Sequence, residues 1–242
     1  DGLRSPVDFE NSIIKGRMGS GKTMFLRANY AYYLFNIIPR LLEKEELILP
    51  VFIRLSDFQH IKEPAEIYRQ LIIKIVEEVS TIYLKLQDMK SMGSIHYGMK
   101  NIPQDIYFDE KIKATAKQLL KLGSDEYVEK LSSEFGIEGQ AKYSFFGLSA
   151  KINNTNVIEL KKKQNPGIND IVTIYDLLLK DCDGKLLLLI DEAGSLDRQF
   201  FRDDQNDSFF EIFMNQLRTA SFIRTKIAVY PNSYSDILTE TR

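Results

Sequence analysis

The spacing of apolar and polar positions changes several times along the chain, and these changes predict alternating strands and helices. Short runs rich in Ile, Val and Leu predict buried strands at Ser12–Lys15, Leu47–Leu55, Leu186–Ile190 and Lys226–Tyr230. A long amphipathic helix is expected over Ile61–Lys90, where apolar residues recur at helical spacing. The run Leu186–Ile190 is apolar throughout, which is typical of a strand buried on both faces in a parallel sheet.

Shorter helices are predicted between these strands. They are expected at Lys22–Asn36, Phe108–Leu122, Asp125–Phe135, Ile168–Lys180 and Phe209–Phe222. Strands that alternate with helices indicate an α/β fold, in which helices are layered on a mostly parallel central sheet. We expect one domain over residues 1–242.

One stretch does not fit the alternation of strands and helices. Gly136–Leu160 holds three glycines together with aromatic and β-branched residues, and this mixture predicts a β-hairpin-like insertion. The whole inserted region is expected to cover about residues 91–166, ahead of the strand Leu186–Ile190.

Composition narrows the class of protein only slightly. With 242 residues and 44% hydrophobic residues, the chain can bury a core without disulfides, and its one cysteine, Cys182, excludes a disulfide framework. The net charge of −2 gives no overall attraction to nucleic acid. Neither a secretory leader nor an apolar run of membrane-spanning length is evident, so a cytoplasmic location is expected. Because the chain begins at Asp1, we expect a piece of a longer protein.

The strongest chemical signal follows the first strand directly. Gly16–Thr23 reads Gly-Arg-Met-Gly-Ser-Gly-Lys-Thr, which matches the phosphate-binding pattern G-x-x-x-x-G-K-[ST]. Glycines let the backbone N–H groups turn towards phosphate oxygens, Lys22 can reach the β- and γ-phosphates, and Thr23 can ligate Mg²⁺. The residues expected to bind the nucleotide are Gly16, Arg17, Met18, Gly19, Ser20, Gly21, Lys22, Thr23 and Met24.

A second signal ends the most apolar strand. The run Leu186–Ile190 leads into Asp191 and Glu192, which resembles a Walker B motif. Asp191 is expected to hold Mg²⁺, and Glu192 is expected to orient the water that attacks the γ-phosphate. Parallel strands bring such groups together at their carboxyl ends, so the two motifs should meet there.

The acidic pair also bears on which nucleotide is bound. Adjacent Asp and Glu are typical of ATPases that carry an extra strand between the two motifs. Asp191–Gly194 also satisfies the Asp-x-x-Gly pattern of GTPases, but the chain has no Asn-Lys-x-Asp sequence to read guanine. ATP is therefore favoured, and a GTPase is kept as a weaker alternative.

Taken in order, these motifs resemble the AAA+/STAND branch of P-loop ATPases. The strand segment Pro50–Phe58 is similar to the strand after the phosphate-binding loop in NACHT-type and origin-recognition-type bacterial ATPases. The resemblance implies the three-layer sandwich of P-loop NTPases with a five-stranded core sheet, Mg²⁺-ATP as cofactor, and homo-oligomers with ATP at subunit boundaries. Many relatives act in replication initiation or as antiphage switches.

The same resemblance suggests further site residues. Asn232, after the last predicted strand, fits the sensor that contacts the γ-phosphate, with Ser233 as the alternative and an ordinary turn as the competing interpretation. Arg218, Arg224 and Arg242 are candidates for an arginine finger, although a helix arginine is usually solvated.

The expected function is an ATP-hydrolysing core that switches an assembly between states. One alternative is a nucleotide clamp with little turnover, and another is a DNA-associated ATPase of the replication-initiator type. The basic run Lys161–Lys163 beside aromatic residues could touch nucleic acid, but such a run is more often solvated. About ten residues follow Asn232, so no helical lid can be placed, and further domains of the longer protein are expected partners.

Overall fold

The computed structural model describes residues 8–38, 47–91, 106–134, 165–191, 196, 198–201 and 207–230. Within these residues four strands form one sheet, in which all neighbours are parallel and the order is β1-β4-β3-β2. Their bounds are Ser12–Lys15 for β1, Ile48–Arg54 for β2, Lys185–Asp191 for β3 and Ile223–Val229 for β4. The expected parallel α/β architecture is confirmed.

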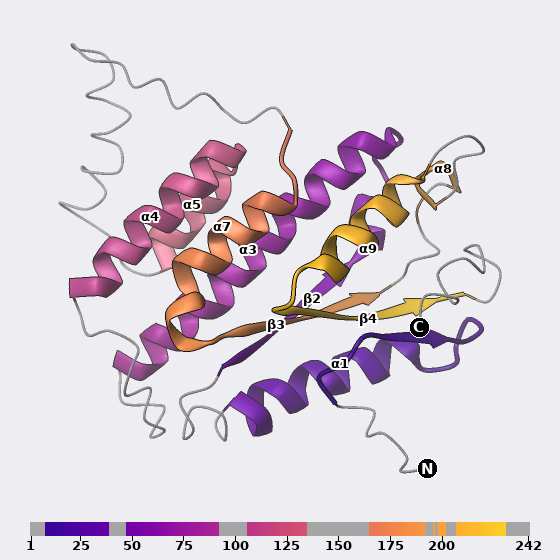
Figure 1. Cartoon of the computed structure of the whole chain (residues 1–242), viewed down its shortest axis with the longest axis horizontal. Helices are drawn as coiled ribbons and strands as arrows, with labels where there is room; N and C mark the ends of the chain where they lie inside the picture. The colour runs from indigo at the N-terminus through magenta and orange to yellow at the C-terminus, as the bar shows by residue number, and fades with distance from the viewer. Residues whose placement is uncertain are drawn as a thin grey trace.

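Helices cover both faces of this sheet (Figure 1). On one face lies α1 (Lys22–Tyr32), which continues into a π-helical turn, η1 (Tyr33–Ile37). On the other face lie α3 (Pro64–Ser91), α7 (Ile168–Leu178) and α9 (Phe209–Thr219). The remaining helical segments are η2 (Leu55–Phe58), α4 (Ile106–Leu122), α5 (Asp125–Glu134), η4 (Lys180–Cys182) and α8 (Arg198–Phe201).

Successive side chains along a strand point to opposite faces of the sheet, so the sheet divides the hydrophobic core into two clusters. Leu186, Leu188 and Ile190 of β3 join the large cluster under α3, α7 and α9, whereas Leu187 and Leu189 join the small cluster under α1. All five side chains are fully buried. A strand that buries both faces has no polar face to expose, which explains the unbroken apolar run.

The helices α4 and α5 form a second tier outside α3. Leu119 and Leu122 of α4 and Val128 of α5 are buried in the same large cluster. Gln118 Nε2 also donates to Asp170 Oδ1 at 3.3 Å, which joins α4 to the first turn of α7. These helices lie within the region predicted as an insertion, while the predicted hairpin Gly136–Leu160 lies outside the described residues.

Two predicted boundaries near the end of the chain were wrong. The helix predicted to reach Phe222 ends at Thr219, and the strand predicted to begin at Lys226 begins at Ile223. The backbone becomes extended at Ala220, and Phe222 stacks on Tyr175 with the ring centroids 3.7 Å apart. Apolar residues in this stretch fit either period, so their pattern did not locate the boundary.

Membrane-spanning segments were searched among the described helices. None of them combines the length and the apolar character that crossing a bilayer requires.

Candidate functional site

The loop between β1 and α1 folds as its glycines require. Gly19 and Gly21 adopt φ values of 79° and 85°, a left-handed conformation that costs other residues about 1–2 kcal/mol. At Gly16, a Cβ atom would lie 2.3 Å from the hydroxyl oxygen of Ser20, so the loop closes tightly over this position. The loop therefore curls directly before Lys22, where α1 begins.

Lys22 turns back into the loop that precedes it. Its side-chain ammonium donates hydrogen bonds to the carbonyl oxygens of Gly16, at 2.6 Å, and Arg17, at 2.9 Å. Only 9% of the residue is exposed, although the neighbouring loop residues are on the surface. The amide of Gly16 donates to the carbonyl of Val229 at 3.4 Å, which fixes the start of the loop to the end of β4.

Asp191 lies at the same edge of the sheet as this loop. It ends β3, is 1% exposed, and follows Leu187 and Leu189 at alternate positions, so its side chain is on the face covered by α1. The strand β4 separates β3 from β1. Adjacent strands are about 4.8 Å apart, which places Asp191 roughly 10 Å from the end of β1.

The other predicted site residues fall into two groups. Thr23 is partly buried on the first turn of α1, and Met18 and Met24 are exposed around the loop. Glu192, Asn232, Ser233, Arg242 and the run 161–163 lie outside the described residues.

Two of the predicted arginines lie far from the loop along the strand direction. Arg224 is at the start of β4 and donates to the carbonyl oxygen of Ile223 at 2.7 Å. Arg218 is in the last turn of α9, just before the same end of β4. Both therefore lie at the end of the strands opposite to the loop between β1 and α1.

Tyr230 was not anticipated at this site. The ammonium of Lys22 lies over its ring, 4.2 Å from the ring centroid, which is within the range of a cation–π contact. The residue follows β4 immediately, at the edge of the sheet where the loop lies. Its place at the end of the predicted strand Lys226–Tyr230 was the signal in the sequence that could have pointed to it.

A buried polar pair lies beneath α1. Lys226 of β4 is 1% exposed, and its ammonium donates to the amide oxygen of Asn29 at 3.2 Å. Burial lowers the pKa of Lys226, while the carboxylates of Glu10 and Asp8 act in the opposite direction. The pair connects the middle of the sheet to α1, the helix that follows the loop after β1.

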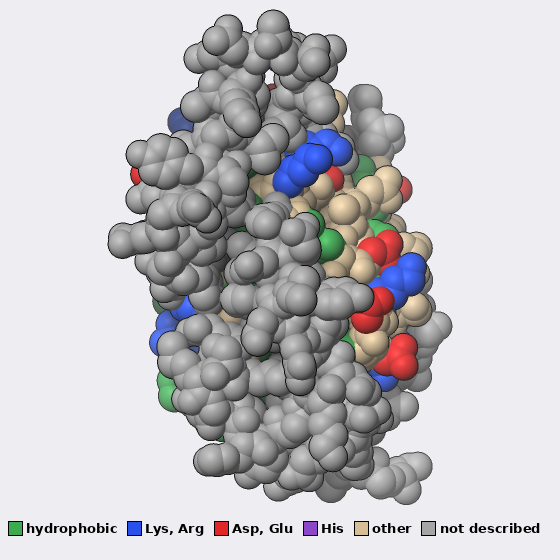
Figure 2. Space-filling view, turned by 90° about the vertical axis from the view of Figure 1, so that its left-hand side faces the viewer, with side chains coloured by type: hydrophobic (Ala, Val, Ile, Leu, Met, Phe, Trp, Pro, Cys, Tyr) green, Lys and Arg blue, Asp and Glu red, His purple; other side chains and the backbone are tan. Residues whose placement is uncertain are grey.

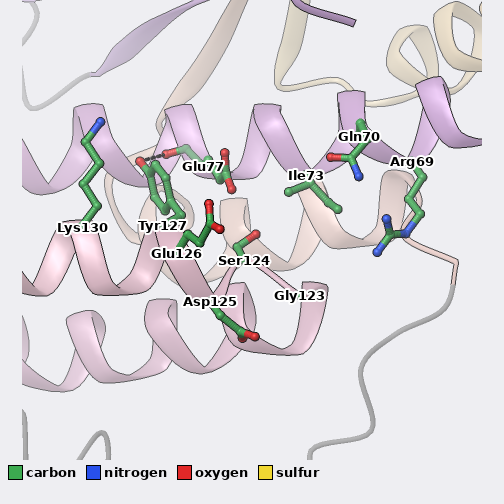
Figure 3. Close-up of a pocket in the computed structure, with 10 residues that line it drawn as sticks. All are labelled: Arg69, Gln70, Ile73, Glu77, Gly123, Ser124, Asp125, Glu126, Tyr127 and Lys130. Atoms are coloured by element: carbon green, nitrogen blue, oxygen red, sulfur yellow. Dashed lines mark hydrogen bonds between the residues drawn. The ribbon is translucent and has the colours of Figure 1, made fainter. Parts of the chain in front are cut away.

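A separate pocket of about 610 Å³ lies between α3 and the turn that joins α4 to α5 (Figure 3). In the close-up, Glu77 and Glu126 point towards Ser124, and Lys130 and Arg69 lie at opposite ends. Burial raises the pKa of Glu77, although the Ser124 hydroxyl and nearby lysines oppose this. Among the described residues, no group of three or more His, Cys, Asp or Glu side chains is placed to hold a metal ion.

Charge on the described part of one surface is mixed. Figure 2 shows basic and acidic side chains close to one another on the face that it presents, without a broad area of one sign among the coloured atoms. Opposite charges are also paired along α3, where Lys74 Nζ lies 2.7 Å from Glu78 Oε1.

Comparison with known proteins gives little further guidance. The chain is similar to the bifunctional polymyxin resistance protein ArnA of Wigglesworthia glossinidia brevipalpis, with 23% identity over 223 residues. The match covers 87% of this chain and 32% of ArnA, so the chain spans about a third of that relative's length. No family model matches the chain, and no solved structure matches it.

Proposed function

We propose that this chain is the Mg²⁺-ATP-binding core of a P-loop ATPase of the AAA+/STAND type. The observation that carries the proposal is the position of Lys22, whose ammonium lies inside a glycine-turned loop at the carboxyl edge of a parallel sheet. Ligands of open α/β sheets bind at this edge. The start of α1 adds N–H groups that have no partner within the helix and that favour phosphate.

The strand order supports an ATPase in preference to a GTPase. The strand β4 lies between β1, which leads into the loop, and β3, which ends in Asp191. A strand between the two motifs is typical of the ATPases that carry adjacent Asp and Glu residues. The position of Asp191 also supports the proposed ATP site. Its side chain lies on the face of the sheet that α1 covers, and Thr23, the other expected Mg²⁺ ligand, belongs to α1.

Each residue then has a defined role. Lys22 and the loop amides bind the phosphates, and Thr23 and Asp191 hold Mg²⁺, which needs only one or two protein ligands when phosphates supply the others. When bound there, Mg²⁺ would supply charge neutralisation at the transferred phosphoryl group. Glu192 orients the attacking water, and Asn232 contacts the γ-phosphate. The resemblance adds assembly as a homo-oligomer that acts as a switch in antiphage defence.

The first experiment is calorimetric titration with Mg²⁺-ATP. Lys22→Ala should weaken binding about 10- to 100-fold, because a hydrogen bond to a charged group is lost. Arg27→Ala is the matched control, since it removes an exposed cation from the same helix. GTP should bind more weakly than ATP. Equal binding by the wild type and Lys22→Ala would contradict the proposal.

Turnover is tested separately with Glu192→Gln. The variant should keep ATP affinity and lose hydrolysis, because the carboxylate that orients water is gone. A wild type that binds ATP tightly, shows no turnover and assembles as Glu192→Gln does would instead be a nucleotide clamp. ATPase activity that rises with DNA and falls steeply with salt would indicate the replication-type alternative.

A further inference from the structure

Within the described part of the chain, the Lys22 ammonium contacts three groups, two of which belong to the phosphate-binding loop. The carbonyl oxygens of Gly16 and Arg17 accept two of its N–H groups. The third neighbour is the ring of Tyr230, which is distant from the loop in the sequence but lies beside it in the fold. The ring face carries partial negative charge, so it attracts the cation without using a directed hydrogen bond.

We propose that Tyr230 is a positioning residue that holds the Lys22 ammonium ready for phosphate. This inference rests on the proposed ATP site and names a residue that acts through Lys22. A lysine side chain has four rotatable bonds and about 2 kcal/mol of rotamer entropy, so an unsupported ammonium would sample many positions. The two carbonyls and the ring confine it to the mouth of the loop before nucleotide arrives.

The contact with the ring is compatible with phosphate binding. An ammonium can turn one N–H towards a phosphate oxygen and keep its position over an aromatic face, because that attraction depends on distance more than on N–H direction. The carbonyl of Val229, the residue before Tyr230, accepts from the Gly16 amide, so backbone contact fixes the ring beside the loop. Tyr230 therefore favours nucleotide binding and does not compete with it.

The contact can be tested first in the protein without nucleotide. The chain contains no tryptophan, so Tyr230→Trp places a single tryptophan beside the ammonium, which can be excited at wavelengths that tyrosine does not absorb. Adding Lys22→Ala to this variant should change the intensity and wavelength of its emission. Adding Arg27→Ala should leave both unchanged, because Arg27 is exposed on α1. If Lys22→Ala leaves the emission of the Tyr230→Trp variant unchanged, the proposed contact between Lys22 and residue 230 is wrong.

The positioning role is then tested by titration with Mg²⁺-ATP. Tyr230→Leu should weaken binding about five-fold, the size expected for a partly exposed cation–π contact. Tyr230→Phe keeps the ring and should bind within about two-fold of the wild type. Circular dichroism and thermal unfolding of both variants check that the fold is intact.

The two proposals fail in different ways. If wild-type protein binds ATP through Lys22 but Tyr230→Leu binds equally well, the positioning role alone is wrong. If the wild type binds no nucleotide, the ATP site is wrong and the positioning role falls with it, whatever the emission of Tyr230→Trp shows about the contact. Loss of affinity in Tyr230→Leu with recovery in Tyr230→Phe supports both.

Discussion

The two faces of the sheet are built differently. The face towards α3, α7 and α9 is thick and apolar, and α4 and α5 form a further tier outside it. The face towards α1 is covered by that helix and its π-helical continuation, and it includes the buried pair of Lys226 and Asn29. Met24 and Phe35 of this helical segment are 68% and 76% exposed.

This difference separates stability from function. The thick face buries most of the apolar surface, which is the main source of folding free energy. The thin face carries the glycine loop, Lys22 and Asp191, where charge and backbone geometry matter more than apolar area. A substitution on the thick face should therefore cost more unfolding free energy than a matched substitution on the thin face.

The sharpest test uses two adjacent leucines of β3. Leu188 faces the thick side and Leu189 faces α1, and both are fully buried. Leu188→Ala should cost about 4 kcal/mol and Leu189→Ala about 2–3 kcal/mol, since a single covering helix can close the cavity more easily. Urea unfolding measures both. Equal losses would mean that the two layers are equally rigid.

The buried polar pair gives the next largest effect. Asn29→Leu should destabilise the protein by about 2 kcal/mol, because the Lys226 ammonium loses a buried hydrogen bond. Asn29→Leu combined with Lys226→Met should return stability to within about 1 kcal/mol of the wild type, since both polar groups are removed together. Asn36→Leu, at an exposed position, is the control. A double variant no more stable than Asn29→Leu would contradict this account.

Smaller effects are expected in the loop on the thin face. Gly19→Ala and Gly21→Ala should each cost about 1 kcal/mol, because alanine resists positive φ although the space for its Cβ is open. Gly167 also has room for a Cβ, with Tyr68 Oη 3.8 Å away, but its φ is −154°. Gly167→Ala should therefore cost nothing measurable in thermal unfolding. A loss at Gly167 as large as that at Gly19 would show that φ is not the cause.

The smallest effect concerns Glu77 of α3, which lines the pocket between α3 and the turn that joins α4 to α5. Because burial raises the pKa of Glu77 above its usual value of 4.5, the folded state binds a proton more tightly than the unfolded state. The cost of charging Glu77 is therefore present at neutral pH, shrinks as pH falls through the raised pKa and is absent below about pH 4.5.

Glu77→Gln should accordingly be slightly more stable than the wild type at neutral pH, by less than about 1 kcal/mol. The gap should close in acid, as urea unfolding at several pH values can measure. Glu78→Gln is the control, because Glu78 pairs with Lys74 at 2.7 Å and its loss should not stabilise the protein. If the stability difference between Glu77→Gln and the wild type widened in acid, the pKa of Glu77 would be shifted in the opposite direction.

Much of this molecule could be read from local sequence. The apolar run of β3 predicted a strand buried on both faces, and the 28-residue helix α3 follows its apolar spacing. The tight loop between β1 and α1 was predicted because its glycines, Lys22 and Thr23 lie within eight residues, Gly16–Thr23. These features depend on periods and spacings of a few residues, which are visible in the sequence without knowledge of the tertiary contacts.

Other features arise only when distant segments meet. Three such features join residues that are far apart in the chain. They are the strand order β1-β4-β3-β2, the place of Asp191 on the face towards α1, and the contact between Tyr230 and Lys22. Lys226 looked like the polar start of a strand, and packing made it a buried cation paired with Asn29. Local periodicity specifies which residues are buried, but strand order and side-chain partners depend on which elements pack together, and only the tertiary structure decides that.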